Sequence, residues 1–109
     1  MAGDIRWTVN DRYGNNICLT QERWEHAIES INHPEMAGYE EELKQTVQQG
    51  NRRQDPHNLR KYRYSKEFDH LPKDNTHIVA IVLFKFKENE AGEPEPNNYI
   101  VTAYQKEIG

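Results

Sequence analysis

The sequence predicts an α+β fold in which two helices pack on an antiparallel sheet of four to five strands. Apolar residues recur at helical spacing between residues 20 and 50, and from residue 59 onward they alternate with polar residues as in strands. With 109 residues, of which 35% are hydrophobic, the chain is long enough for one core. We therefore expect residues 1–109 to form a single domain with the element order β-β-α-α-β-β-β.

A hairpin is predicted at the start of the chain. Ile5–Arg12 and Asn16–Leu19 are short runs rich in strand-forming residues. Between them, Gly14 and Asn15 tolerate the positive φ that a tight turn requires. The two runs should therefore pair as neighbouring antiparallel strands.

Two helices are predicted after the hairpin. Thr20 is a suitable N-cap for the first, and Pro34 suits the first turn of the second. Gly50 lies where the C-terminal cap of the second helix belongs. The apolar residues expected to face the core recur at helical spacing, at Trp24, Ala27, Ile28 and Ile31 in the first helix and at Met36, Tyr39, Leu43 and Val47 in the second.

Three strands are predicted in the C-terminal half. Residues 59–68 alternate, so that Tyr62, Tyr64 and Phe68 should share one face, with Lys61 and Arg63 on the other. Residues 78–86 form the most apolar run and should be the central strand.

The last strand follows a predicted mobile loop. Residues 88–98 contain one glycine and two prolines, which favour a loop. Residues 99–106 should close the sheet. Simple alternation in this strand predicts two faces, one with Tyr99, Val101 and Ala103 and the other with Ile100, Thr102 and Tyr104.

Charge is distributed unevenly along the chain. The net charge of −4 argues against non-specific nucleic-acid binding, which needs basic groups. Residues 51–66 nevertheless carry a net charge of +5, in contrast to −5 for residues 1–50 and −4 for residues 67–109. Such a segment indicates one localised anion site. It is equally consistent with a strand edge whose cations discourage pairing between sheets.

The remaining composition indicates a cytoplasmic protein without a cofactor. Cys18 is the single cysteine, which fits a reducing compartment. The N-terminus has no signal-peptide pattern, and the longest apolar run, residues 78–84, is too short to span a membrane. His57, His70 and His77 share no ligand spacing with Cys18 or with a carboxylate pair, so no metal site is expected.

Several short segments together resemble a known class of proteins. They are Trp24-Glu25-His26, His33-Pro34-Glu35, Arg52-Arg53-Gln54-Asp55-Pro56, Lys61-Tyr62-Arg63-Tyr64 and Tyr99-Ile100-Val101-Thr102-Ala103-Tyr104. From about Trp7 to Tyr104, the chain resembles the barnase–EndoU–colicin–RelE class of small ribonucleases, in its phage-associated and bacterial toxin branch. A shared fold does not by itself establish shared chemistry.

The resemblance implies a toxin-type endoribonuclease that cleaves RNA without a metal. In that chemistry a base takes the proton of the ribose 2′-hydroxyl, whose oxygen attacks the adjacent phosphate, and an acid protonates the leaving 5′-oxygen. Arginine or lysine stabilises the charge that builds on the phosphate. RNA is the expected partner, and an antitoxin or immunity protein would be a second one.

Six residues are candidates for the catalytic site. His26 lies about 200° around the helix from both Trp24 and Ile28, which puts it off the buried stripe. Its imidazole titrates in the range that acid–base catalysis needs, although an exposed histidine is also an ordinary surface residue. Arg53 is preferred over its neighbour on the resemblance alone. The full candidate set is His26, Arg53, Lys61, Tyr64, Thr102 and Tyr104.

Further residues are candidates for binding RNA. Cations interleaved with tyrosines provide the phosphate neutralisation and base stacking that single-stranded RNA requires, although alternate tyrosines also serve as packing. Thr102 and Tyr104 offer hydroxyl donors, or are simply good strand formers. The predicted RNA-binding residues are Arg52, Arg60, Tyr62, Arg63 and Lys66.

A second function is compatible with the same sequence. The chain can be a non-catalytic interaction module that binds nucleic acid or an acidic protein through residues 52–66. The enzyme requires His26, a cation and a hydroxyl in one cleft. If these groups are scattered over the surface, the module is favoured.

Overall fold

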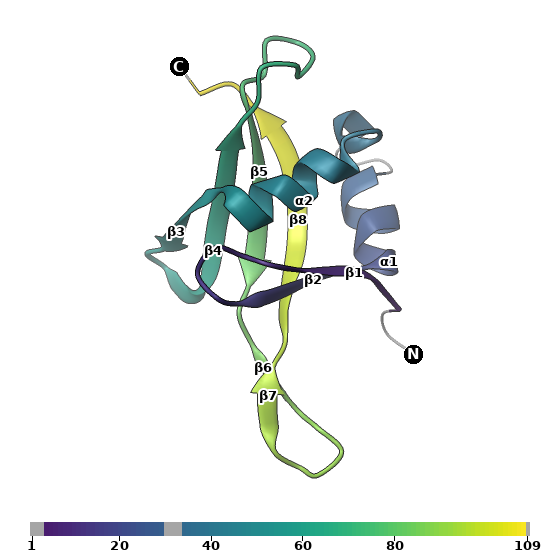
Figure 1. Cartoon of the computed structure of the whole chain (residues 1–109), viewed down its shortest axis with the longest axis vertical. Helices are drawn as coiled ribbons and strands as arrows, with labels where there is room; N and C mark the ends of the chain where they lie inside the picture. The colour runs from purple at the N-terminus through teal and green to yellow at the C-terminus, as the bar shows by residue number, and fades with distance from the viewer. Residues whose placement is uncertain (1–3, 30–33, 109) are drawn as a thin grey trace.

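The computed structural model describes residues 4–29 and 34–108, which form a six-stranded sheet with helices on one side (Figure 1). The strand order is β1-β2-β8-β5-β4-β3. Strands β2 and β8 are parallel, and the other neighbours are antiparallel. The strands are β1 Ile5–Asn10, β2 Asn16–Thr20, β3 Asn51–Asp55, β4 Asn58–Glu67, β5 His77–Leu83 and β8 Asn98–Lys106.

The predicted architecture of two helices on an antiparallel sheet of four to five strands is therefore wrong. One reason is β3, which the predicted element order leaves out and which pairs with β4. It is an edge strand of polar residues, and such strands lack the apolar alternation by which a strand is recognised. The other reason is the parallel pairing of β2 with β8, which joins the hairpin to the main sheet.

The helical segments are shorter than predicted. Thr20 caps the first as expected, because its Oγ1 accepts the backbone N–H of Arg23 at 3.2 Å. The four segments are α1 Gln21–Arg23, the π-helical η1 Trp24–Glu29, the 3₁₀ turn η2 Pro34–Met36 and α2 Glu40–Gln49. Ile31 and His33 lie outside the described residues, as does the side chain of Ala27.

Gly50 ends α2 through a close approach of the backbone rather than through a left-handed conformation. Its φ is −72°, and a Cβ added there would lie 2.6 Å from the carbonyl oxygen of Ser65 on β4. A side chain at this position would therefore push α2 away from β4.

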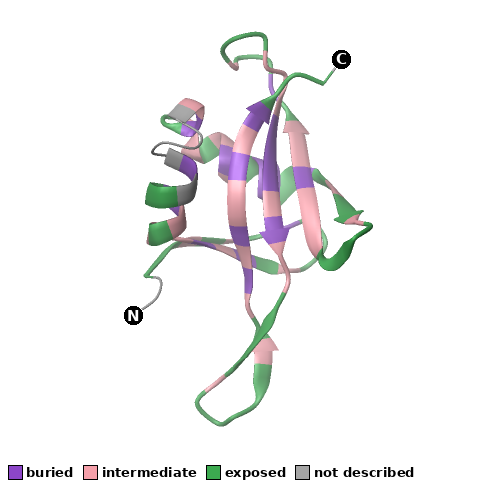
Figure 2. Ribbon diagram, turned by 180° about the vertical axis from the view of Figure 1, so that it is seen from behind, coloured by how far each residue is buried: buried purple, intermediate pink, exposed green. Residues whose placement is uncertain are grey.

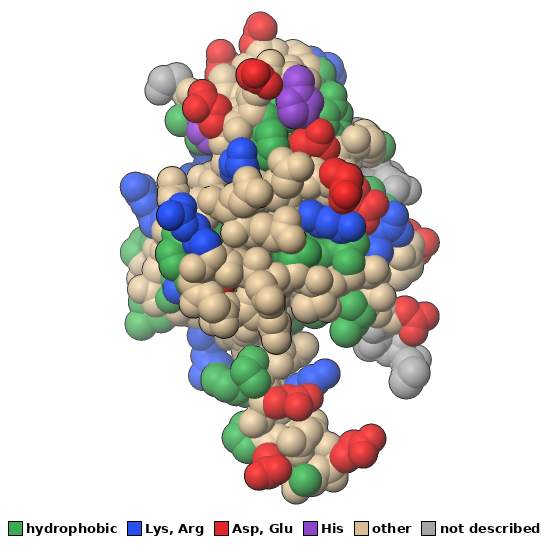
Figure 3. All heavy atoms as spheres, viewed as in Figure 1, with side chains coloured by type: hydrophobic (Ala, Val, Ile, Leu, Met, Phe, Trp, Pro, Cys, Tyr) green, Lys and Arg blue, Asp and Glu red, His purple; other side chains and the backbone are tan. Residues whose placement is uncertain are grey.

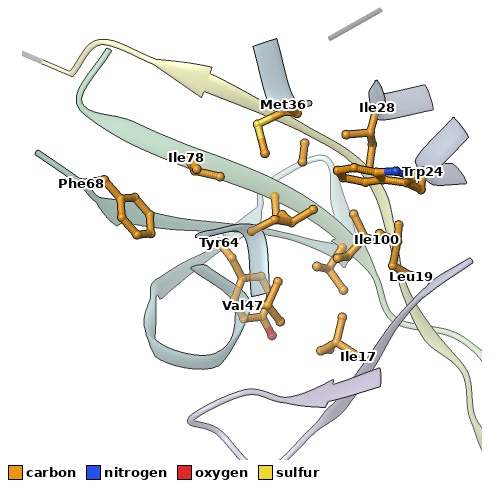
Figure 4. Packing of buried hydrophobic residues seen from close by; sticks show 14 residues of the cluster. Ile17, Leu19, Trp24, Ile28, Met36, Val47, Tyr64, Phe68, Ile78 and Ile100 are labelled. Carbon is orange, nitrogen blue, oxygen red and sulfur yellow. The ribbon is translucent and has the colours of Figure 1, made fainter. Parts of the chain in front are cut away.

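The core lies between the helices and one face of the sheet (Figure 4). Trp24 and Ile28 of the predicted first stripe are buried, as are Leu43 and Val47 of the second. The other fully buried apolar side chains on this side come from the hairpin, η2 and the sheet: Ile17, Leu19, Met36, Tyr64, Ile78, Ala80, Val82, Ile100 and Ala103. Strand β5 is central, as predicted, because it pairs with both β4 and β8.

The segment 88–98, predicted as a loop, contains part of a second, two-stranded sheet. Strands β6 Phe86–Glu88 and β7 Pro94–Pro96 pair antiparallel and project from the end of the main sheet (Figure 1). Acidic side chains gather on this projection (Figure 3).

The sheet has two different sides. We call the side under the helices the covered face and the opposite side the open face. No helix lies in front of β4, β5 and β8 when the molecule is seen from behind (Figure 2). The β1–β2 hairpin crosses the covered face and reaches β3, where Arg12 Nη1 donates to Asn51 Oδ1 at 3.2 Å (Figure 1).

Candidate functional site

On the covered face, Arg52 is enclosed by aromatic rings and a carboxylate. Its guanidinium carbon lies 4.2 Å from the ring centroid of Tyr13 and 4.5 Å from that of Tyr62. Its Nη1 is 3.7 Å from Asp11 Oδ2 and 3.4 Å from the Tyr64 hydroxyl. This arginine ties β3 to the β1–β2 turn.

Asp11 is the centre of that arrangement, and its side chain is fully shielded from solvent. Tyr64 donates its hydroxyl to Asp11 Oδ2, and the backbone N–H groups of Tyr13 and Asn15 donate to Oδ1 at 2.9 and 2.8 Å. Burial raises the pKa of the Asp11 carboxyl, but these hydrogen bonds outweigh burial and lower the pKa overall. Burial and the bond to Asp11 raise the pKa of Tyr64.

On the open face, three cations converge where β3 meets β4. Arg53 and Arg63 are directly opposite each other in the β3–β4 ladder. Lys61 lies two residues before Arg63, so the pleat directs it to the same side. Among the residues that the structure describes, no ion pair joins any of these three to a carboxylate.

These cations line a hollow of about 370 Å³, which we call the main hollow. Its opposite wall and floor come from Ile81 on β5 and from Val101 and Thr102 on β8. Both β8 residues reach it because the ladder slips there: Ile81 pairs with Thr102, whereas Val82 pairs with Ile100. The slip is a β-bulge at Val101, which re-aims that side chain to the open face.

A second hollow of about 310 Å³, the edge hollow, lies on the other side of the arginine pair. Arg53 and Arg63 line it as well as the main hollow. It is also lined by Asn51 and Ser65, which are opposite each other in the β3–β4 ladder, and by Arg52 and Ile108. The arginine pair is therefore the partition between two hollows on one sheet face.

Arg63 has unsatisfied hydrogen-bond donors. Its Nε and Nη2 are buried, and neither has a hydrogen-bond partner. These two nitrogens form the edge of the guanidinium that donates two parallel hydrogen bonds to one oxyanion. Arg6 uses the same edge for the Glu40 carboxylate, with Nη2 2.9 Å from Oε1 and Nε bonded to Oε2. Leaving such donors without an acceptor costs about 1–3 kcal/mol or more for a charged group.

The predicted catalytic residues fall into two groups. Arg53, Lys61 and Thr102 line the main hollow, and Tyr104 is on the same open face, opposite Val79. Tyr64 points into the core and is fully buried, so it is not on the surface that the other strand residues share. His26 is exposed on η1, on the helix side of the sheet.

The predicted RNA-binding residues also separate. Arg63 lines both hollows. Arg52 is enclosed by aromatic rings on the covered face and also borders the edge hollow. The Tyr62 ring packs against Phe84, with ring centroids 4.9 Å apart, although the residue also borders the main hollow. Lys66 Nζ lies over the ring of Phe68, 4.5 Å from its centroid, and Arg60 is exposed near the start of β4.

The apolar floor of the main hollow and the whole edge hollow were not predicted from the sequence. Ile81 and Val101 supply the floor, and Asn51 and Ser65 border the edge hollow. A signal for the floor was present, because a strand that is apolar at consecutive positions is typical of burial on both faces. Val79, on the open face, is indeed fully buried. No sequence pattern indicated the bulge at Val101.

Residues 4–29 and 34–108 were searched for membrane-spanning helices and for groups of metal-binding side chains. Within them, no helix has the length and apolarity needed to cross a membrane. In the same part of the chain, His, Cys, Asp and Glu side chains do not assemble in a group of three that a metal ion would require.

Comparisons of the chain with protein-family models, with curated proteins and with solved structures find no match.

Proposed function

We propose that this protein is a binding module for single-stranded RNA and that the RNA backbone lies on the open face along β3 and β4. The observation that supports it most is the set of Arg53, Lys61 and Arg63, three cations beside one hollow without a carboxylate partner among the described residues. Backbone phosphates are the anions such a set neutralises. Asp55 borders the same hollow, but its Oδ1 accepts the backbone N–H groups of His57 and Asn58.

A nucleic acid fits this face better than an acidic peptide because the face also has apolar and aromatic groups. Tyr99 and Tyr104 are directed to the open face of β8, opposite Leu83 and Val79 of β5. Bases stack on such rings, and this stacking depends little on which base is present. The acidic remainder of the chain keeps contact with RNA confined to this face.

The test is a fluorescence-anisotropy titration of a short single-stranded RNA at several salt concentrations. Three phosphate contacts give a slope of about −2 in a plot of log affinity against log salt. The triple variant Arg53→Gln, Lys61→Gln and Arg63→Gln should lose most of the affinity and most of that slope.

A matched control removes the same charge elsewhere. Lys44→Gln, Lys66→Gln and Lys73→Gln together leave the open-face cations intact, and this variant should bind as the wild type does. Equal loss in both variants would mean that net charge, and not the open face, governs binding. An acidic protein domain that binds at the same cations while RNA does not would replace RNA as the partner.

A ribonuclease is the second candidate, and one observation favours it. Lys61, Arg63 and the Thr102 hydroxyl line the same hollow as the Asp55 carboxylate. A base there would take the 2′-hydroxyl proton, and the oxygen would attack phosphorus. The bond to the 5′-oxygen would break as the Lys61 ammonium gives that oxygen a proton, which leaves a cyclic phosphate and a 5′-hydroxyl. His26 is on the other side of the sheet and takes no part in this proposal.

Cleavage is tested on one RNA and on the same RNA with a single 2′-deoxy position. An enzyme should cut the first and bind, but not cut, the second. Asp55→Asn should slow cutting by roughly 10²–10⁴ if the carboxylate is the base. Growth arrest on induced expression, relieved by the same variant at equal protein level, would identify the activity as toxic. Binding of both RNAs without cleavage supports the module alone.

A further inference from the structure

The two hollows of the open face differ in chemistry although they share their arginines. The main hollow has carbon groups of Ile81 and Val101 as floor and wall, with the Thr102 hydroxyl and Lys61 at its margin. The edge hollow has a single apolar residue, Ile108, and offers the polar residues Asn51 and Ser65 beside Arg52, Arg53 and Arg63. An apolar hollow with a few polar groups suits a ring system, and a hollow lined by donors suits an oxyanion.

The two hollows are neighbours along β4. Lys61 and Ser65 are four residues apart on β4, which corresponds to about 13 Å along a strand. Arg63 is halfway between them and lines both hollows. A nucleoside and its own phosphate would therefore meet the arginine pair from the two sides at once.

We propose that the smallest ligand of the open face is one nucleotide, with the nucleoside in the main hollow and the phosphate on Arg53 and Arg63 at the edge hollow. This inference rests on the proposed RNA binding and refines it. The phosphate oxygens are the acceptors for the Nε and Nη2 groups of Arg63. Those atoms are shielded from solvent, so the guanidinium turns toward the edge hollow as the phosphate arrives.

The test compares adenosine, inorganic phosphate, and adenosine 3′- and 5′-monophosphate by chemical-shift titration of the ¹⁵N-labelled chain. At least one monophosphate should bind about tenfold or more tightly than either adenosine or phosphate. Amide signals of both Ser65 and Val101 should move with the monophosphate, and only the Ser65 side should move with inorganic phosphate.

Two variants separate the hollows. Val101→Asn places a polar group on the apolar floor and should weaken the monophosphate about tenfold without changing phosphate binding. Arg63→Lys keeps the charge but removes the bidentate edge, so it should weaken phosphate and monophosphate while leaving the salt slope for RNA unchanged. Thermal unfolding of each variant verifies that it is folded.

The outcomes distinguish this inference from the function on which it rests. If RNA binds with the expected slope but the monophosphate binds no better than phosphate, the nucleotide assignment is wrong and the RNA-binding module stands. The same conclusion follows if Val101→Asn leaves the monophosphate unaffected. If neither RNA nor phosphate shifts any open-face signal, both proposals fail.

Discussion

Arg52 and Arg53 are adjacent in the chain, yet they lie on opposite faces of the sheet and in different surroundings. On the covered face, Arg52 lies among the rings of Tyr13 and Tyr62 and beside the Asp11 carboxylate. On the open face, Arg53 lies opposite Arg63, where buried donors have no acceptor. Because a strand alternates its side chains, one residue step is enough to separate a structural cation from a binding one.

The positive charge of residues 51–66 therefore has two functions rather than one. Part of it stabilises the fold through Asp11 and the aromatic rings on the covered face. In the remainder, Arg63 has two buried donors without an acceptor and lines the main hollow with Arg53 and Lys61, so these three cations are the part available to a ligand. Substitutions should accordingly change stability on one face and binding on the other.

The largest expected effect is on the covered face. Asp11→Ala removes the acceptor of the Tyr64 hydroxyl and the partner of Arg52. Unfolding free energy should fall by about 3 kcal/mol, the lower end of the range for breaking a buried pair, since Arg52 keeps part of its surface in water. Urea denaturation measures this loss, and RNA affinity per folded molecule should stay at the wild-type value. Weaker RNA binding by the folded variant would contradict the separation of the faces.

The same carboxyl predicts a pH dependence. The pKa of Asp11 is lowered in the folded state, so its contribution is complete above the unfolded pKa of about 3.9 and is lost as pH falls through the folded value. Denaturation midpoints measured from pH 6 down to pH 2 should show this loss below about pH 4. Asp11→Asn should start lower and lose less over that interval. Parallel curves for the two proteins would remove Asp11 as a source of acid sensitivity.

A matched pair of arginine variants tests the comparison most directly. Arg63→Met removes the two unpaired donors and should leave stability unchanged or raise it by up to about 1 kcal/mol. Arg52→Met removes the partner of Asp11 and should lower stability by about 1–3 kcal/mol. RNA affinity should fall about tenfold in the first and remain unchanged in the second. The reverse pattern would exchange the roles of the two faces.

The smallest effect is expected at His26. This residue is exposed on η1, on the helix side of the sheet, so His26→Ala should change unfolding free energy by no more than about 0.5 kcal/mol. RNA affinity and any cleavage rate should also be unchanged. A large loss of cleavage at constant stability would restore the histidine to the mechanism.

The features that could be predicted from the sequence depend on residues that are close together in the chain. Alternation in β4 correctly put Tyr64 and Lys61 on opposite faces, and Thr20 was correctly identified as a helix cap. Both features depend only on residues that are close in the chain. Strand side chains alternate with a period of two residues, and a cap side chain bonds to the backbone three residues ahead. The same alternation did not show that Tyr64 is the one that faces the core, and its assignment to the catalytic set was wrong.

Two other features depend on residues that are far apart in the chain. β3 is a strand because β4 lies beside it, and Val101 faces outward because β8 slips against β5 by one residue. Neither the pairing of β3 nor the bulge at Val101 leaves a periodic pattern in the sequence. Both are fixed by hydrogen bonds to another strand and not by the local side chains. Arg52 and Arg53 are the same residue type in one short segment, and the groups folded against each decide which is structural and which remains available to a ligand.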